Sequence, residues 1–116
     1  MSKVTLYHNP RCSKSRQTLA LLEEHGVEPR IVEYLKDPPD AATLRALLGK
    51  LGMEAKELLR RKEPPFKELG LKAKLDDADA LVEAMVAHPV LIERPIVVVG
   101  RKARIGRPPE QVLEIL

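Results

Sequence analysis

The chain has 116 residues, of which 44% are hydrophobic and 32% are charged, and its 20 basic and 17 acidic residues leave a net charge of +3. This size and balance predict one folded domain covering residues 1–116 and exclude a disordered chain. The charge excess is mild, and only two tyrosines and one phenylalanine are available to stack on bases. The composition therefore excludes a typical nucleic-acid-binding protein.

No apolar run reaches the length that crosses a bilayer, and the first predicted strand begins too early to leave room for a cleavable signal segment. We therefore expect a cytoplasmic protein without a membrane partner, and we expect it to be a monomer. The three histidines are scattered and lack metal-ligand spacing. No metal site and no bound cofactor are predicted.

The first part of the chain predicts a strand, a helix and a second strand. Residues 4–7 and residues 31–34 have the pattern of short strands. Between them, Ser13 or Ser15 can cap a helix that ends at Gly26. A strand, a helix and a strand of these lengths favour a parallel strand pair. The helical residues expected to face the core are Leu19 and Leu22.

The most regular helix is predicted directly after Asp40, which can cap it. Its leucines follow the i, i+3, i+4, i+7 spacing of a buried helix face, and Gly52 ends it. These leucines are Leu44, Leu47, Leu48 and Leu51. The regular spacing predicts a helix packed on one side.

Two shorter helical segments are expected further along. Residues 55–61 are predicted to be helical, and residues 64–70, which begin with two prolines, are predicted to form a loop. Asp76 and Asp77 then begin a helix that ends at Pro89. Its apolar face is expected to consist of Ala78, Leu81, Val82 and Met85.

The last part of the chain predicts a hairpin and a helix. Residues 96–99 are a continuous β-branched run, which is typical of a central strand buried on both sides. Gly100 turns the chain so that residues 103–105 can pair back. A final helix is predicted for residues 110–116.

The only cysteine, Cys12, lies between the first predicted strand and the first predicted helix. The helix N-terminus and the nearby Arg11, Lys14 and Arg16 favour a thiolate, and such surroundings lower thiol pKa values to about 3.5–7.5. The alternative is a buried apolar cysteine without chemistry. A single cysteine cannot form an internal disulfide, so any redox cycle needs an external thiol such as glutathione or a partner protein.

Cys12 and Ser15 form a C-x-x-S arrangement, in which serine cannot resolve a disulfide. The Ser15 hydroxyl can donate a hydrogen bond to the sulfur or to a bound oxyanion, or it can cap the helix. His8 can stabilise the thiolate if its ring is protonated, or it is a polar residue at a strand end. Converging arginines could hold a small oxyanion, because the guanidinium fork matches tetrahedral anions.

The order of elements, with a cysteine at the first helix N-terminus, resembles the thioredoxin fold. The resemblance implies an α/β, thioredoxin-like (glutaredoxin-like) architecture: a mixed four-stranded sheet with flanking helices and a helical insertion. Pro95 comes directly before the third strand, where this fold has a cis proline facing the cysteine. A cis bond is therefore predicted there, although only about 5–6% of X-Pro bonds are cis in general.

The run His8-Asn9-Pro10-Arg11-Cys12, with Ser15-Arg16, resembles the glutaredoxin-dependent arsenate reductase (ArsC) family. The likeness extends over essentially the whole chain through motifs in the family's order and spacing. These motifs are Tyr34-Leu35, Asp37-Pro38-Pro39, Leu58-Leu59-Arg60, His88-Pro89, Glu93-Arg94-Pro95-Ile96-Val97-Val98 and Gly106-Arg107-Pro108. An ordered set of this kind is a far more specific signal than the cysteine motif alone.

The resemblance implies that Cys12 is the nucleophile and that His8 helps to keep its sulfur ionised. The arginines implied to hold arsenate and its adducts are Arg60, Arg94 and Arg107, and Arg16 is a further candidate. Glutathione is implied as the co-substrate and glutaredoxin as the protein partner. From the residues alone, Arg107 could not be chosen over Arg101, Lys102 and Arg104, which lie close by.

The sequence excludes one related class of enzyme and leaves two alternative functions open. Tyrosine-phosphatase-like arsenate reductases need an arginine six positions after the cysteine, and Thr18 stands there, so that class is excluded. A thiol-dependent or glutathione-dependent reductase of another substrate is the first alternative, because better-known arsenate reducers carry Gly-Thr in place of Ser13-Lys14. The second is an Spx-like regulator that binds RNA polymerase, although such proteins use a C-x-x-C switch.

Overall fold

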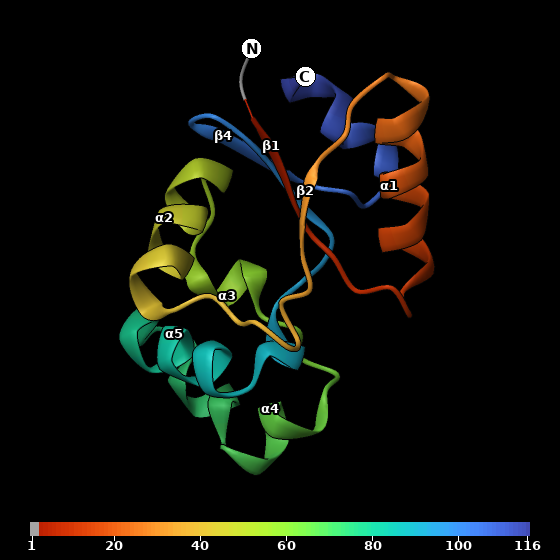
Figure 1. Ribbon diagram of the computed structural model, residues 1–116. Helices are drawn as coiled ribbons and strands as arrows, with labels where there is room; N and C mark the ends of the chain where they lie inside the picture. The colour runs from red at the N-terminus through yellow and green to blue at the C-terminus, as the bar shows by residue number, and fades with distance from the viewer. Residues whose placement is uncertain (1–2) are drawn as a thin grey trace. The chain divides into compact units, whose positions relative to one another are not determined.

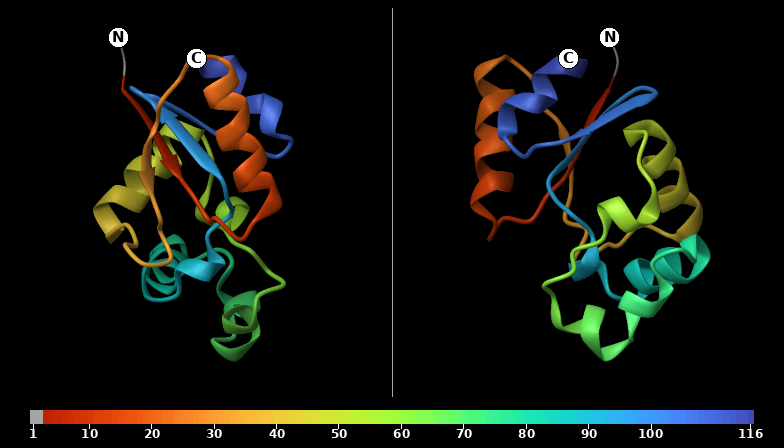
Figure 2. Two further views of the ribbon diagram at one scale, coloured as in Figure 1. Left: turned by 45° about the vertical axis from the view of Figure 1, so that its right-hand side comes forward. Right: turned by 180° about the vertical axis from the view of Figure 1, so that it is seen from behind.

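The computed structural model describes residues 3–116, whose contacts divide the chain into two compact units (Figures 1 and 2). Residues 3–37 and 94–116 form the first, which we name the sheet unit. Residues 38–93 form the second, which we name the helical unit. The prediction of a single domain over residues 1–116 is not tested by this division.

The sheet unit contains one sheet of four strands in the order β2-β1-β3-β4. The strands are β1 (Val4–Tyr7), β2 (Arg30–Val32), β3 (Ile96–Val99) and β4 (Lys102–Ile105). Strand β1 is parallel to β2 and antiparallel to β3, and β3 is antiparallel to β4. The predicted mixed sheet is therefore confirmed, with β3 as one of its two central strands.

The core of the sheet unit lies between the sheet and two helical segments that contact each other, α1 (Ser13–Glu24) and the 3₁₀ helix η3 (Pro109–Ile115) (Figure 2). Leu6 and Val97 are directly paired across β1 and β3, and paired residues share a face of the sheet. The buried cluster consists of Leu6, Val97, Leu22, Val112 and Ile115. The last segment of the chain thus completes the core begun by the first strand.

The helical unit consists of six short segments. They are α2 (Ala41–Leu51), α3 (Ala55–Leu58), α4 (Pro64–Glu68), η1 (Leu71–Lys74), α5 (Ala78–Ala87) and η2 (Pro89–Leu91). Helix α5 contacts α2, α3, η1 and η2. Asp40 and Asp77 cap α2 and α5 by accepting hydrogen bonds from backbone amides, as predicted. Gly52 ends α2 in the left-handed conformation that glycine adopts without steric cost.

Two predictions in the helical unit are wrong. Residues 64–70 were expected to form a loop but contain α4, because a proline in the first turn of a helix loses no hydrogen bond. The helix expected at residues 55–61 ends at Leu58, and Leu59 instead forms a β-bridge with Ile92. Arg60 therefore does not lie on a helix.

Three features of the sheet unit differ from the prediction. The second strand covers residues 30–32 rather than 31–34, because the amides of Lys36 and Asp37 donate to the Glu33 carbonyl and close a turn there. Helix α1 is preceded by Cys12 at its N-cap position rather than by a serine. The final segment is a 3₁₀ helix. The peptide bond before Pro95 is cis, as predicted, and so is the bond before Pro108.

Candidate active site

Cys12 occupies the N-cap position of α1, with an extended backbone (φ −93°, ψ 124°). Its amide donates to the carbonyl of Asn9 at 2.9 Å, and its own carbonyl accepts from the amide of Arg16 at 3.0 Å. These bonds fix the turn from the loop into the helix. The sulfur makes no capping hydrogen bond of ordinary geometry. It nevertheless lies in the field of the unpaired amides of the first turn.

The surroundings of Cys12 favour the thiolate. Burial raises the pKa of the thiol, since only 8% of the residue is exposed. The backbone amide of Ser15, the Arg94 guanidinium, the amide of Lys14 and the Arg107 guanidinium all lower it, in that order of importance. The net effect is a pKa below the ordinary thiol value. Cys12 is therefore buried, but among cations and amide dipoles rather than in a purely apolar pocket.

Arg107 is held against the sulfur by a backbone contact. Its Nη2 donates to Sγ of Cys12 at 3.6 Å, and its Nε donates to the carbonyl of Arg94 at 2.7 Å. In the β3–β4 ladder Ile96 pairs with Ile105, so continuing this register places Arg94 opposite Arg107. The hairpin thus explains why Arg107, rather than its basic neighbours, reaches the thiol. The signal was present in the sequence, since a tight turn at Gly100 predicts this register.

The Ser15 hydroxyl is bonded away from the sulfur. It shares a hydrogen bond of 2.6 Å with Nδ1 of His8 and accepts another from the amide of Asn9 at 3.0 Å. Both His8 and Ser15 are buried. The hydroxyl therefore ties the helix to the loop and neither binds the sulfur nor caps α1, while the Ser15 amide acts on the thiol. A hydrogen bond from this hydroxyl to a bound oxyanion stays a prediction.

The surroundings of His8 lower the pKa of its ring. Burial lowers the pKa of the imidazole, the nearby Glu33 carboxylate raises it and the Arg16 guanidinium lowers it, with a net decrease from its ordinary value. This direction disfavours the protonated ring, and the attraction between a protonated imidazole and the thiolate stays a prediction. His8 acts on the loop through its bond to Ser15.

Arg16 is exposed, and its Nη1 donates to the carbonyl of Pro10 at 2.9 Å. This contact braces the loop that precedes Cys12. The guanidinium groups whose charge lowers the pKa of Cys12 are those of Arg94 and Arg107. A substrate-binding role for Arg16 stays a prediction.

Arg60 belongs to the helical unit, where it is partly buried. Its Nη1 lies 2.8 Å from a carboxylate oxygen of Glu63, and its Nε lies 4.0 Å from one of Glu93. Its backbone amide donates to the carbonyl of Leu91 at 2.7 Å. It is thus an ordered, ion-paired residue rather than a freely solvated one, and its role in holding arsenate stays a prediction.

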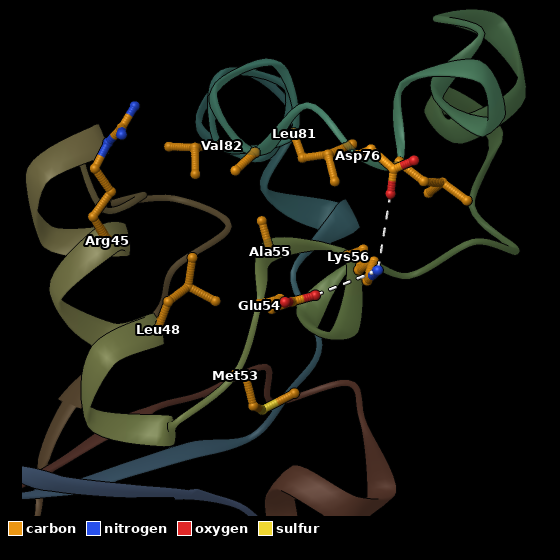
Figure 3. A pocket seen from close by; sticks show the side chains of 11 residues that line it. Arg45, Leu48, Met53, Glu54, Ala55, Lys56, Asp76, Leu81 and Val82 are labelled. Carbon is orange, nitrogen blue, oxygen red and sulfur yellow. Dashed lines mark ion pairs between the residues drawn. The ribbon is translucent and has the colours of Figure 1, made fainter.

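The helical unit also contains a cavity of about 410 Å³ (Figure 3). Leu48, Met53, Leu81 and Val82 are among its apolar lining residues. At its rim Nζ of Lys56 lies 3.4 Å from Glu54 and 3.9 Å from Asp76, as the dashed lines show. The lining contains neither cysteine nor histidine, so this cavity offers no nucleophile of the kind found at Cys12.

Within residues 3–116, no three or more histidine, cysteine, aspartate or glutamate side chains are grouped so as to hold a metal ion. No helix in the same range combines the length and the apolar character that crossing a membrane requires.

Residues 7–115 match the family model named ArsC. A protein of Escherichia coli strain K12, which carries the name uncharacterized protein YfgD, is 63% identical over 98% of this chain and 97% of its own length. An arsenate reductase of the same strain is 45% identical over 100% of this chain and 82% of its own length. An arsenate reductase from Rhizobium meliloti strain 1021 is 47% identical over 97% and 81%, respectively.

A solved structure, that of an arsenate reductase from Vibrio cholerae, is 52% identical to this chain and has a TM-score of 0.95. The match covers 99% of this chain and 98% of the other. The predicted α/β, thioredoxin-like architecture is therefore confirmed.

Proposed function

Because this chain belongs to the ArsC family, we propose that it reduces arsenate to arsenite with Cys12 as the nucleophile. The observation that carries the proposal is a thiol of lowered pKa in the field of Arg94 and Arg107. Arsenate near neutral pH is an anion, which a thiolate repels, and guanidinium groups offset that repulsion. The names of relatives that are 45% and 47% identical support arsenate as the substrate.

The first step forms a bond between Sγ of Cys12 and arsenic and breaks an arsenic–oxygen bond, so that the oxygen leaves as water after protonation. The Arg94 and Arg107 guanidinium groups stabilise the negative charge that develops on the remaining oxygens. Arg107 is already bound to the sulfur and to the Arg94 carbonyl, so it needs little reorganisation to act. Arsenic is still in the +5 state after this step.

External thiols supply the two electrons. The sulfur of glutathione bonds to arsenic, and a second oxygen leaves as water. A glutaredoxin thiolate then attacks the glutathione sulfur to form a mixed disulfide, and the electron pair of the sulfur–arsenic bond stays on arsenic, which becomes +3. One water then hydrolyses the Cys12–arsenic bond and releases arsenite. The single cysteine of the chain supports this dependence on other molecules.

The test is turnover of arsenate in a coupled assay that contains glutathione and glutaredoxin, with each thiol omitted in turn. We expect turnover only with both thiols, and we expect none in a Cys12→Ser variant of the same protein. Turnover that persisted in that variant would refute the role of the thiol. Turnover without glutaredoxin would refute the proposed source of electrons.

A second candidate is a reductase that removes glutathione from other disulfides. The observation that favours it is the dipeptide Ser13-Lys14, where known arsenate reducers of the family carry Gly-Thr. The dipeptide thus has a basic residue two positions after Cys12. The same protein preparation distinguishes the two, because arsenate and a glutathionylated peptide can be offered side by side. A high rate with the peptide and a negligible rate with arsenate would favour the second function.

A further inference from the structure

Gly106 comes directly before Arg107 and is packed more tightly than four other glycines of the chain. A Cβ at this position would overlap Oγ1 of Thr18 and would lie 2.9 Å from Cγ of Pro95. By contrast, a Cβ would meet nothing within 4 Å at Gly26, Gly49, Gly52 and Gly70. Gly106 does not have a positive φ, so glycine is needed there because of space and not because of backbone conformation.

Both residues that touch Gly106 belong to the surroundings of the thiol. Thr18 is fully buried on α1, and its Oγ1 donates to the carbonyl of Lys14 at 2.8 Å. The amide of Lys14 is one of the two that lower the pKa of Cys12. Pro95 follows Arg94, the other cation that acts on the sulfur. Gly106 therefore lies where the hairpin meets the helix that carries the thiol.

The backbone at Gly106 extends the β3–β4 ladder beyond the two strands. The amide of Gly106 donates to the carbonyl of Pro95 at 2.9 Å, and Nε of Arg107 donates to the carbonyl of Arg94 at 2.7 Å. These two bonds and the close packing on Thr18 hold the segment at three points. The guanidinium at the end of this segment is 3.6 Å from the sulfur.

We propose that Gly106 is a positioning residue, which sets the distance between the Arg107 guanidinium and the Cys12 sulfur by allowing the backbone to lie directly on Thr18. A methyl group at position 106 meets a hydrogen-bonded side chain and a proline ring, and neither is the movable end of a flexible chain. The segment must then move away from α1, and a shift of about 1 Å suffices to loosen a site of this kind.

This inference deepens the proposed function, because both depend on the pair of Cys12 and Arg107, but its test needs no arsenate. The rate of Cys12 alkylation by iodoacetamide, a neutral reagent, is measured against pH. We expect Gly106→Ala to raise the pKa of Cys12 and to lower the alkylation rate at pH 6 by about threefold to tenfold. An unchanged profile in folded Gly106→Ala protein would overturn the proposal.

Thr18 provides the matched controls. Thr18→Ala removes the overlapping oxygen, whereas Thr18→Val loses the same hydrogen bond but keeps the bulk. Combined with Gly106→Ala, the alanine should restore much of the wild-type alkylation profile, and the valine should not. Equal restoration by both would show that the hydrogen bond, and not the space, matters. Gly106→Ala alone could fail to fold, and the double variant Gly106→Ala/Thr18→Ala then takes its place. The alkylation profile of the folded double variant should lie closer to that of wild type than the profile of Arg107→Gln does. The reverse order would overturn the proposal.

A double-mutant cycle that combines Gly106→Ala with Arg107→Gln completes the test. In protein that already carries Arg107→Gln, Gly106→Ala should cause no further change in the pKa of Cys12, because the group that it displaces is absent. A further rise would show that Gly106 acts through the helix amides, and it would overturn the proposal. These alkylation measurements test the role of Gly106 separately from the proposed function. If wild-type protein does not reduce arsenate, the proposed function fails, but the variants can still show or lack the expected shifts in the pKa of Cys12.

Discussion

The two units use their helix N-termini in different ways. In the helical unit, α2 and α5 begin after Asp40 and Asp77, whose carboxylates accept hydrogen bonds from amides of the first turn. In the sheet unit, α1 begins after Cys12, whose side chain forms no such cap. The amides of Ser15 and Lys14 instead lower the pKa of the thiol.

This contrast separates a structural use of a helix N-terminus from a chemical one. A capping aspartate satisfies the amides permanently and stabilises the helix. A cysteine satisfies them only when it is ionised, so the same amides favour the reactive form of the side chain. Arg45 and Arg60 of the helical unit and Arg104 of the sheet unit pair with carboxylates, whereas Arg107 donates a hydrogen bond to the sulfur.

The largest effect is expected from Cys12→Ser, which replaces the thiol at the N-cap position of α1 with a side chain that caps the helix. Arsenate turnover should be lost, whereas the free energy of unfolding at pH 5 should rise by about 0.5–1 kcal/mol, because serine is a good N-cap. Turnover assays and urea unfolding check the two parts. A serine variant that unfolds at lower urea concentration than wild type would contradict the capping argument.

The next effect concerns the arginines. Arg94→Gln should lower arsenate turnover by about 100-fold and raise the pKa of Cys12, because a cation is removed from the charge that develops in the reaction. Arg45→Gln is the matched control, since Arg45 is exposed and pairs with Asp79 at 2.9 Å. Initial rates of arsenate turnover give the comparison. Equal losses of turnover in the two variants would contradict a special role for the arginine near the thiol.

A smaller effect is expected at the capped helices. Asp77→Ala should lower the free energy of unfolding by about 1 kcal/mol, because Asp77 accepts a hydrogen bond from the amide of Ala80. The neighbouring Asp76→Ala removes an exposed charge that is 3.9 Å from Lys56, and it should change stability by less than about 0.5 kcal/mol. Urea unfolding of both variants gives the comparison. A larger loss in Asp76→Ala would contradict it.

The smallest effect is a dependence of stability on pH. Because the pKa of Cys12 is lowered by folding, the unfolded state binds this proton more tightly, and ionisation of the thiol stabilises the folded state. That contribution is complete above the ordinary thiol pKa and is lost as the pH falls through the folded value. The unfolding free energy of wild type, minus that of Cys12→Ser, should therefore increase with pH. A difference that stayed flat or decreased would contradict the lowered pKa.

Much of the fold can be predicted from local sequence patterns. The β-branched run at residues 96–99, the leucine spacing after Asp40 and the capping aspartates each specify an element through contacts within a few residues. The failures have local causes as well. The pair Pro64 and Pro65 predicts the start of a loop, although proline is equally suited to a first helical turn, as in α4.

The candidate site was only partly predictable, because its chemistry depends on burial. The position of Cys12 before a helix follows from the sequence, but the lowered pKa of His8 does not, since its largest cause is burial inside the folded sheet unit. The same holds for the Ser15 hydroxyl, which His8 and Asn9 bind. The close packing of Gly106 on Thr18 joins two segments that are distant in the sequence, and neither segment alone predicts this contact.

The division of the sheet unit into two stretches of sequence affects how the protein is made. On the ribosome, Cys12 emerges long before Arg94, Arg107, Val112 and Ile115. The sheet unit cannot close its core or bring a guanidinium to the sulfur until those late residues arrive. A nascent chain therefore lacks the two guanidinium groups that help to lower the pKa of Cys12 until the hairpin that carries them has been synthesised.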